Sequence, residues 1–367
     1  MKILYDHKIF STQKFGGVSK YFCELLKNIP REYWDTTTFI ANNEYIKSSK
    51  LFNYYDFLPN LPFKGKALLM NLLNRPYTYG KLMAGNYDIF HQTDFDTYYF
   101  KAIKGKKMVM TFHDMNYSKF RNLYTNTLTN NIDKRELLQK KSIERADRVI
   151  AVSQNTKNDL MNIWNVNPEK IVVIHHGVDN NKRTDLDMGR VIENPYILYV
   201  GERYGFKNFD RFIKAFSIVA QNNVDLKLIC TGRNFSDEEK NVIQNLRLTN
   251  KTIQICADEY TMAKLYRDAE MFVYPSYSEG FGMPILEAMV YDCPVAVSNA
   301  SCLPEVAGDA AVYFDPYQID DMAEQMEALL TSTALRKEKI TLGIKRLKHF
   351  SWEKTAQEHI AVYQSLL

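Results

Sequence analysis

Short apolar runs alternate with helical stretches along almost the whole chain, and this alternation constrains the fold more than any other feature. Strands that alternate with helices form parallel sheets whose faces are covered by the helices. In the first half the predicted helices are 18–27, 132–146 and 154–164, and Ser153 is a natural N-cap for the last of them. In the first half the predicted strands are 2–5, 37–41, 88–91, 107–112, 148–152 and 171–175.

A second alternation follows a polar segment that ends at Pro195. The chain is long enough for two domains with complete cores. The sequence therefore predicts an α/β protein with two doubly wound, Rossmann-like domains and a cleft between them. Such sheets bind ligands beyond the carboxyl ends of their strands. The predicted parts are a first domain at 1–183, a linker at 184–194, a second domain at 195–350 and a final helix at 351–367.

The composition argues against several functional classes. No run of eighteen apolar residues is present, so the sequence predicts no membrane span. The net charge of +4 is too small to indicate nucleic-acid binding, and the aromatic residues show no stacking pattern with basic ones. The N-terminal residues read as a strand rather than a signal peptide. The five cysteines are scattered, odd in number and without metal-binding spacing, a pattern that fits a reducing compartment, so we expect a cytoplasmic protein.

The segment from Glu279 to Glu287 is the most informative motif. Two carboxylates bracket a glycine-rich turn, which follows an apolar run at 271–274 and leads into a helix near Pro284. Gly280 and Gly282 allow close approach of a ligand. The N–H groups of the turn and the first helical residues can hold an anion such as a diphosphate. The carboxylates are suited to accept hydrogen bonds from sugar or ribose hydroxyls, so the motif indicates a sugar-nucleotide site.

Two further segments lie where such a ligand is expected. Arg203 and Lys207 follow the first strand of the second domain, after Gly201, and such a cationic pair can neutralise a departing diphosphate. Solvated loop charges are the alternative reading. Gly16 and Gly17 open a helix after the first strand of the chain and offer N–H groups to a phosphate or sugar.

Three other features carry hypotheses of their own. His113 directly follows the predicted strand 107–112, where chemistry occurs in α/β domains. Asp94 and Asp96 have a spacing that could bind a divalent cation, but a polar loop before the aromatic run 98–100 is the favoured interpretation. The stretch 63–83 mixes leucines with basic residues, which predicts either a helix packed on its own domain or peripheral contact with an anionic membrane.

The chain resembles the family-4 retaining glycosyltransferases of GT-B architecture. Residues 274–289, Tyr-Pro-Ser-Tyr-Ser-Glu-Gly-Phe-Gly-Met-Pro-Ile-Leu-Glu-Ala-Met, reproduce the Glu-x7-Glu signature of that family. Residues 298–311 resemble the bacterial branch with mannosyl- and rhamnosyltransferases of surface polysaccharides. Phe350-Ser-Trp352 resembles the start of the C-terminal helix that crosses back to the first domain.

The resemblance implies a role for each matching residue. Glu279 would hold the donor sugar and Glu287 the ribose, while Arg203 and Lys207 would hold the diphosphate. Gly17 would lie against the donor phosphates. The remaining donor-site residues implied by the match are Gly16, Gly201, Gly280, Phe281, Gly282, Met283, Pro284 and Ile285, and His113 would lie beside the transferred sugar. One departure is Glu202, which separates Gly201 from Arg203.

The resemblance implies metal-independent transfer of a hexose, with retention of configuration. The donor would be a nucleotide diphosphate sugar, with GDP-mannose favoured over a UDP-sugar and no further cofactor. The acceptor would be a glycan or lipid-linked glycan of O-antigen or capsule type, bound by the first domain. The protein would be cytoplasmic or peripheral on the inner face of the membrane. A sugar-nucleotide epimerase or hydrolase and a non-catalytic donor-binding subunit are the alternatives from other classes.

Overall fold

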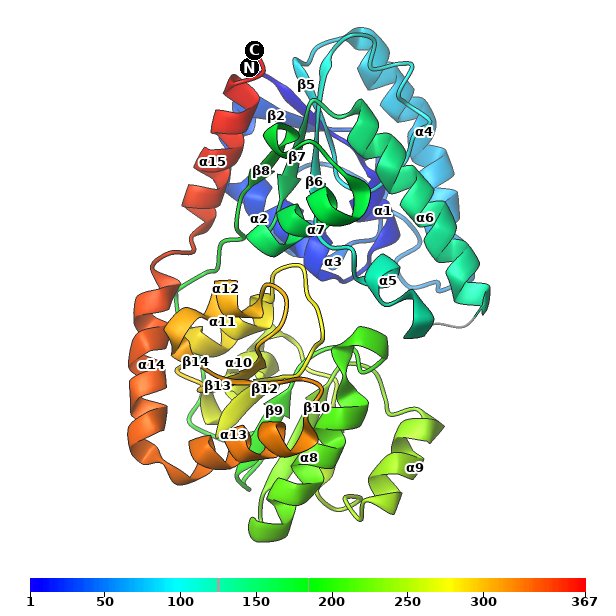
Figure 1. Cartoon of the computed structure of the whole chain (residues 1–367). Helices are drawn as coiled ribbons and strands as arrows, with labels where there is room; N and C mark the ends of the chain where they lie inside the picture. Colours follow the sequence, from blue (N-terminus) through cyan, green and yellow to red (C-terminus); the bar gives the residue numbers. More distant parts are fainter. Residues whose placement is uncertain (124–125, 184) are drawn as a thin grey trace. The chain divides into compact units, whose positions relative to one another are not determined.

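The computed structural model describes residues 1–123, 126–183 and 185–367 of the chain. It divides into two compact units, each built around a parallel sheet with helices against it (Figure 1). The first unit contains Met1–Gly177 together with Trp352–Leu367, and the second contains Val178–Ser351. The structure therefore has the predicted fold class, with two Rossmann-like α/β units.

The first unit has one parallel sheet with the strand order β2-β1-β5-β6-β7-β8. A separate short pair, β3 and β4, lies outside this sheet. The strands of the unit are β1 (Ile3–Tyr5), β2 (Trp34–Thr36), β3 (Ile40–Ala41), β4 (Tyr55–Asp56), β5 (Ile89–Gln92), β6 (Lys107–Phe112), β7 (Arg148–Ala151) and β8 (Ile171–Val173).

Alternate residues of these strands face opposite sides, and both sides are buried under helices. On one side Tyr5, Val109 and Ile150 pack with α2 and α15, while on the other Met110 and Phe112 pack with α6 and α7. The helices of the unit are α1 (Lys8–Thr12), α2 (Gly17–Asn28), α3 (Glu44–Ser49), α4 (Lys66–Ala84), α5 (Asn116–Lys119), α6 (Asn126–Arg145), α7 (Gln154–Trp164) and α15 (Trp352–Gln364).

The last helix, α15, belongs to the core of the first unit although it ends the sequence. The hydroxyl groups of Tyr363 and Tyr5 lie 2.7 Å apart, and the Tyr363 hydroxyl is 2.6 Å from Nδ1 of His91. His359 Nε2 lies 2.8 Å from the Tyr21 hydroxyl on α2. Buried polar groups need hydrogen-bonding partners, so these contacts fix how α15 lies on the sheet and on α2.

The second unit repeats the architecture with the strand order β11-β10-β9-β12-β13-β14. Its strands are β9 (Tyr196–Tyr199), β10 (Lys227–Thr231), β11 (Thr252–Ile255), β12 (Met271–Tyr274), β13 (Val295–Ser298) and β14 (Ala311–Phe314). Its helices are α8 (Phe209–Asn222), α9 (Asp237–Asn245), α10 (Glu259–Asp268), α11 (Met283–Val290), α12 (Leu303–Ala307), α13 (Ile319–Thr331) and α14 (Thr333–Leu347).

Two sequence-based expectations differ from the structure. The predicted strand at 37–41 is wrong, because β2 ends at Thr36 and the separate strand β3 begins at Ile40. The segment predicted as a linker, 184–194, is not a free connector where it is described; residue 184 lies outside the described residues. Asp187 pairs with Lys264 on α10 at 2.8 Å, and Arg267 donates to the carbonyl oxygen of Asp187. This segment therefore packs on the second unit.

Each sheet changes direction at one place, and that place positions the candidate site. In the first unit the chain runs from β1 outward to β2 and then returns to β5 on the other side of β1. In the second unit the corresponding change lies between β9 and β12. The loops that leave neighbouring strands in opposite directions there open a crevice at the carboxyl ends of the strands. Ligand-binding residues are therefore expected in the loops after β1, β5, β9 and β12.

Candidate functional site

Lys207 and Glu279 meet at the change of direction in the second sheet. Lys207 ends the short 3-10 helix Gly205–Lys207 that follows β9, and Glu279 lies in the loop after β12. Lys207 Nζ is 2.7 and 2.9 Å from the two carboxylate oxygens of Glu279. The lysine side chain is 20% exposed and the glutamate side chain 10%, so the pair is largely shielded but accessible. A compact cation and an acceptor-only carboxylate are thus held together at one point.

The backbone of Glu279 is held in place from the β13–α12 loop. Ser301 Oγ donates to the carbonyl oxygen of Glu279 at 2.9 Å and accepts from its N–H at 3.2 Å. The thiol of Cys302 lies 3.2 Å from the same carbonyl oxygen. Two residues from a neighbouring loop therefore fix the position from which the Glu279 side chain extends. Sequence reasoning gave Ser301 no role, because no local pattern shows this contact between distant segments.

The glycine-rich turn after Glu279 depends on Gly282, the N-cap of α11. Gly282 has φ +97°, a left-handed conformation that favours glycine. A Cβ atom there would lie 3.0 Å from Leu303 Cδ2 and 3.3 Å from Ile285 Cδ1. Phe281 is buried and its ring packs edge-to-face on Phe350 at 5.8 Å. Phe281 and Ile285 therefore anchor the turn, and their side chains are core residues.

Glu287 and the start of α11 complete this loop. Met283 and Pro284 are its first two residues and are half-buried, with no side chain capping the helix N-terminus. Glu287 lies about one turn later, where the Tyr266 hydroxyl is 3.4 Å from its Oε2. The structure thus places Glu279 before the turn and Glu287 after it, while Gly280 and the rest of the turn lie between them.

Arg203 and Lys207 have different ion-pair partners, Glu239 for the arginine and Glu279 for the lysine. The arginine side chain is fully buried and its Nε is 3.2 Å from Glu239 Oε1 on α9. The guanidinium also donates to the carbonyl oxygens of Thr231 and Asn234, at 3.3 and 3.1 Å. These hydrogen bonds direct the guanidinium into the second unit, and the binding of a diphosphate by Arg203 stays a prediction. The Arg203 side chain therefore points into the unit.

Glu239 caps helix α9 and pairs with two arginines, and a local sequence pattern predicts only the capping. The pattern Ser-x-x-Glu at Ser236 and Glu239 is that of a capping box, and both hydrogen bonds of the box are present at the start of α9. The same carboxylate pairs with Arg203 and with Arg233. Gly201, after β9, has φ +115°, a backbone conformation that side chains rarely adopt. These residues shape the loop in front of Lys207.

In the first unit, Gly16 and Gly17 play different parts at the start of α2. A Cβ atom at Gly16 would lie 2.4 Å from Gln13 Oε1, and that oxygen accepts from the N–H of Ser19 in the first turn. Gly16 therefore leaves room for an internal cap. A Cβ atom at Gly17 would meet nothing within 4 Å. Packing does not require glycine at Gly17, so open space lies in front of its backbone.

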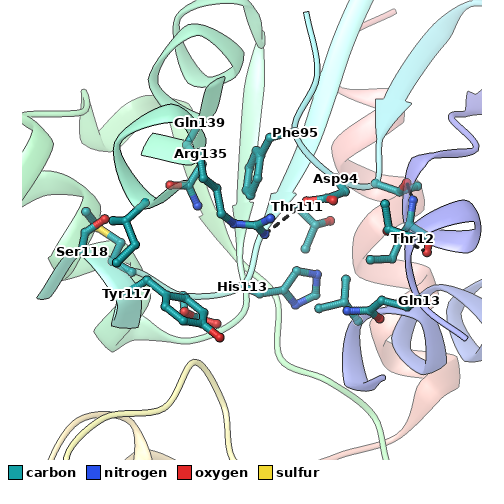
Figure 2. A pocket seen from close by; sticks show the side chains of 16 residues that line it. Thr12, Gln13, Asp94, Phe95, Thr111, His113, Tyr117, Ser118, Arg135 and Gln139 are labelled. Atoms are coloured by element: carbon teal, nitrogen blue, oxygen red, sulfur yellow. Dashed lines mark hydrogen bonds and ion pairs between the residues drawn. The ribbon is translucent and has the colours of Figure 1, made fainter. Parts of the chain in front are cut away.

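A pocket of about 250 Å³ lies at the carboxyl ends of β1, β5 and β6, at the change of direction in the first sheet (Figure 2). Figure 2 shows the imidazole of His113 pointing into it. His113 Nε2 is buried and has no hydrogen-bond partner within the described residues. Burial, with a smaller effect from Arg135, lowers the pKa of His113 to about 3. The pocket thus presents a neutral imidazole that can exchange a hydrogen bond with a hydroxyl but does not act as a cation.

Arg135 and Asp94 form the polar wall of this pocket, and sequence reasoning missed Arg135. Arg135 Nη2 lies 3.2 Å from Asp94 Oδ1, and its guanidinium packs over the Phe95 ring (Figure 2). No local motif marks Arg135, which is one of several basic residues on α6. Asp94 was singled out only as a possible metal ligand, together with Asp96.

The described residues contain no cluster of three or more His, Cys, Asp or Glu side chains placed to hold a metal ion. Asp96 pairs with Lys8 at 2.9 Å, and Asp94 pairs with Arg135, so each of these carboxylates already faces a cation. His91, within β5, is buried between Tyr363 and Thr111 and belongs to the core. His113, directly after β6, is the one of these two histidines that lines the pocket.

Two family models match the chain, one for each unit. Residues 15–182 match the model described as "Glycosyltransferase Family 4", and residues 187–346 match "Glycosyl transferases group 1". Together they cover the greater part of the sequence.

Individual proteins and structures agree with these matches. The chain is 28% identical over 279 residues to "O-antigen chain mannosyltransferase B" of Escherichia coli, and the matched region covers 71% of each protein. It is 33% identical over 180 residues to "O-antigen chain mannosyltransferase RfbU" of Salmonella typhimurium, which covers 49% of this chain and 50% of that one. Among solved structures, Anabaena Alr3699/HepE in complex with UDP and glucose has a TM-score of 0.73 at 17% identity over the full length of both chains. WaaG, a glycosyltransferase of lipopolysaccharide biosynthesis, has a TM-score of 0.72 at 14% identity, over 98% and 99% of the two chains.

Proposed function

Because the chain belongs to the family-4 glycosyltransferases of GT-B fold, we propose that it moves a hexose from a nucleotide diphosphate sugar to a hydroxyl group of a glycan or lipid-linked glycan. We propose that the second unit binds the donor and the first unit binds the acceptor. Mannose is the favoured sugar, since the relatives named above are mannosyltransferases. A UDP-sugar is the second candidate, because the related fold of HepE binds UDP and glucose.

The observation that carries this proposal is the pair formed by Lys207 and Glu279 beside the glycine-rich turn. The ammonium of Lys207 can neutralise charge on the donor diphosphate, and the N-terminus of α11 adds a positive end of a helix dipole. Glu279 accepts hydrogen bonds only, so it suits sugar hydroxyl groups. Glu287, after the turn, is proposed to hold the ribose hydroxyls. Lys207 and Glu279 thus hold each other in place beside the turn that we propose binds the donor.

We propose that the reaction retains the configuration of the transferred sugar and needs no metal ion. The bond between the anomeric carbon and the diphosphate breaks, and the acceptor oxygen attacks from the same face. The acceptor proton passes to the leaving phosphate oxygen, so no protein nucleophile is assigned. Lys207 and the α11 N-terminus stabilise the charge that develops on the departing diphosphate.

His113 takes a positioning role in this scheme. Its low pKa keeps the imidazole neutral at physiological pH, so it orients a hydroxyl of the sugar or acceptor through a hydrogen bond. Arg135 and Asp94 add a donor and an acceptor to the same pocket. A neutral hydrogen-bonding group beside a paired cation and carboxylate suits an uncharged, hydroxyl-rich acceptor better than a charged one.

The first experiment identifies the donor. Thermal unfolding of the whole protein is followed with GDP, UDP, GDP-mannose and UDP-glucose, since a ligand that binds only the folded state raises the melting temperature. We expect the largest rise with GDP-mannose. A rise with UDP-glucose alone would replace mannose with glucose in the proposal, and no rise with any of them would contradict donor binding.

The second experiment tests the residues. Lys207→Met and Glu279→Ala are expected to lower transfer by about 100-fold or more, as removal of one charge-stabilising group does in other enzymes. Lys240→Met is the matched control, because Lys240 pairs with Asp237 on the surface of the same unit. Near-normal transfer by both site variants would refute the assignment. Rapid sugar release or epimerisation without acceptor would favour a hydrolase or epimerase, and saturable donor binding without any turnover would favour a non-catalytic subunit.

A further inference from the structure

The helix α4 is oriented opposite to the usual pattern of a surface helix. A surface helix normally buries its apolar side chains and exposes its polar ones. In α4 three of the five side chains that face the first unit are polar, while four leucines face outward. The inward residues are Met70, Asn71, Asn74, Thr78 and Leu82.

Hydrogen bonds from Asn74 hold α4 on the unit. Its side-chain nitrogen donates to the carbonyl oxygen of Ile40 at 2.7 Å and to Ser11 Oγ at 2.9 Å. Its side-chain oxygen accepts from the N–H groups of Phe39 and Ile40 at 2.8 and 2.9 Å. A buried amide with all these partners fixes the rotation of the helix about its axis. The outward leucines are therefore a consequence of a specific contact and not of loose packing.

The outward residues form one stripe along α4, which we call the α4 face and which lies at the periphery of the first unit (Figure 1). They recur at helical spacing, so they share one side of the helix. Leu68 is 65% exposed and Met83 is 61% exposed. The α4 face consists of Leu68, Leu69, Leu72, Leu73, Tyr79 and Met83. A contiguous exposed apolar stripe marks an interaction surface.

The surroundings of the α4 face are basic. Residues 57–87 contain no aspartate or glutamate but contain Lys64, Lys66, Arg75 and Lys81. Lys81 pairs with Asp35, and Arg75 lies 3.9 Å from Asp96, so part of this charge is neutralised within the unit.

A second basic segment lies beside the C-terminal end of α4. Residues 97–107 contain Lys101, Lys104, Lys106 and Lys107 and no acidic residue. Lys101, Lys104 and Lys106 are exposed, and Lys106 Nζ lies 5.7 Å from the centre of the Tyr87 ring. The stripe is therefore bordered by positive charge along the helix and at its end.

We propose that the α4 face binds the surface of an anionic lipid bilayer. Apolar side chains of such a helix enter the boundary between headgroups and acyl chains, and nearby lysines attract the anionic headgroups. A second copy of the chain fits less well, because it would bring two basic surfaces together. Among the described residues no helix is long and apolar enough to cross a membrane, so binding of this kind is peripheral. The proposal does not depend on the transfer reaction.

Vesicle co-sedimentation of the whole protein tests this proposal. The vesicles are phosphatidylcholine alone, or phosphatidylcholine with about one-third phosphatidylglycerol. We expect binding to the anionic vesicles and little to the neutral ones. Leu68→Ser with Leu72→Ser should weaken it about tenfold or more, since two leucines leave the interface. The matched control is Ile218→Ser with Val224→Ser, two exposed apolar residues of the second unit.

A charge variant and a folding check complete the experiment. Lys101→Gln with Lys104→Gln should weaken binding to anionic vesicles about tenfold or more, as about fivefold is expected for each lysine near such a surface. Circular dichroism melts establish that each variant is folded. No binding to anionic vesicles, equal binding to neutral ones, or no effect of the leucine variant would overturn the proposal. Sedimentation equilibrium that shows a dimer dissociated by the leucine variant, without vesicle binding, would assign the α4 face to a second copy.

Discussion

Replacing Arg203 by methionine should unfold the second unit more easily without removing the donor site. Sequence reasoning treats Arg203 and Lys207 as a pair, but the structure gives them different surroundings. The Arg203 guanidinium donates to Glu239 and to the carbonyl oxygens of Thr231, Arg233 and Asn234. Methionine would fill most of the volume but leave these acceptors without their donor.

The size of the effect follows from the partners that remain. Removing one member of a buried ion pair costs about 3–5 kcal/mol. Glu239 keeps two donors after the substitution, namely Arg233 Nη2 at 3.0 Å and the N–H of Ser236 at 2.7 Å. We therefore expect the lower end, about 3 kcal/mol of unfolding free energy. For a unit of this size that corresponds to a melting temperature lower by roughly 6–12 °C.

Two measurements on the same variants check this reasoning. Thermal unfolding reports stability, and titration with GDP at low temperature, where the variants are folded, reports donor affinity. Arg203→Met should lose stability and largely keep its affinity for GDP, whereas Lys207→Met should lose affinity. Adding Glu239→Gln to Arg203→Met should recover about 1 kcal/mol, because a neutral amide costs less to bury. An Arg203→Met protein with an unchanged melting temperature and lost GDP affinity would refute the structural role.

Three other predictions concern single features of the two units. Gly17→Ala should leave the melting temperature equal or slightly higher, because alanine favours a helix by up to about 1 kcal/mol and the space in front of Gly17 is open. Ser301→Ala should raise the KM for the donor about tenfold with a stability loss of about 1 kcal/mol, since Glu279 loses its backbone contacts. Thermal unfolding at pH 7.5 and pH 5 should show that acid destabilises the first unit. Burial lowers the pKa of His113 to about 3 and that of His359 to about 4, so below about pH 6.5 the unfolded chain binds protons that the folded chain excludes. Each histidine then costs up to about 1.4 kcal/mol of unfolding free energy per pH unit. Burial raises the pKa of Asp6 to about 7, so protonation of this one carboxylate stabilises the folded unit at pH 5 and partly offsets the effect of the two histidines. A melting temperature that does not fall at pH 5 would contradict the prediction.

Much of the fold follows from the periodicity of the sequence. The strand and helix alternation predicts both sheets, because the apolar runs are long enough for buried parallel strands and most of them are followed by a helix. Turns rather than a helix connect β5 to β6. The structure differs from the prediction where hydrogen bonds between residues distant in the sequence determine the local conformation. Strand β3 is one such place, since Asn74 of α4 binds the backbone at Phe39 and Ile40 beside it. No local pattern around residue 40 reports that contact.

Some residues of the candidate site can likewise be placed from the sequence, and others cannot. Glu279, Gly282 and Glu287 lie within one loop and one helix, so their spacing alone places them together. Arg203 could not be assigned from its position after a strand, because a loop residue can point to the ligand side or to the neighbouring helix. Its burial depends on Glu239, which lies more than thirty residues away in the sequence. Arg135 reaches its pocket from a long helix on which several basic residues look alike.

The configuration of the product tests the central claim most directly. Wild-type protein is incubated with the donor that the thermal screen identifies and with a glycan acceptor, and proton NMR identifies the anomeric configuration of the new glycosidic linkage. An α-linked donor should yield an α-linked product, as a retaining hexosyltransferase requires. A β-linked product, or free sugar with no glycosidic product, would contradict the account.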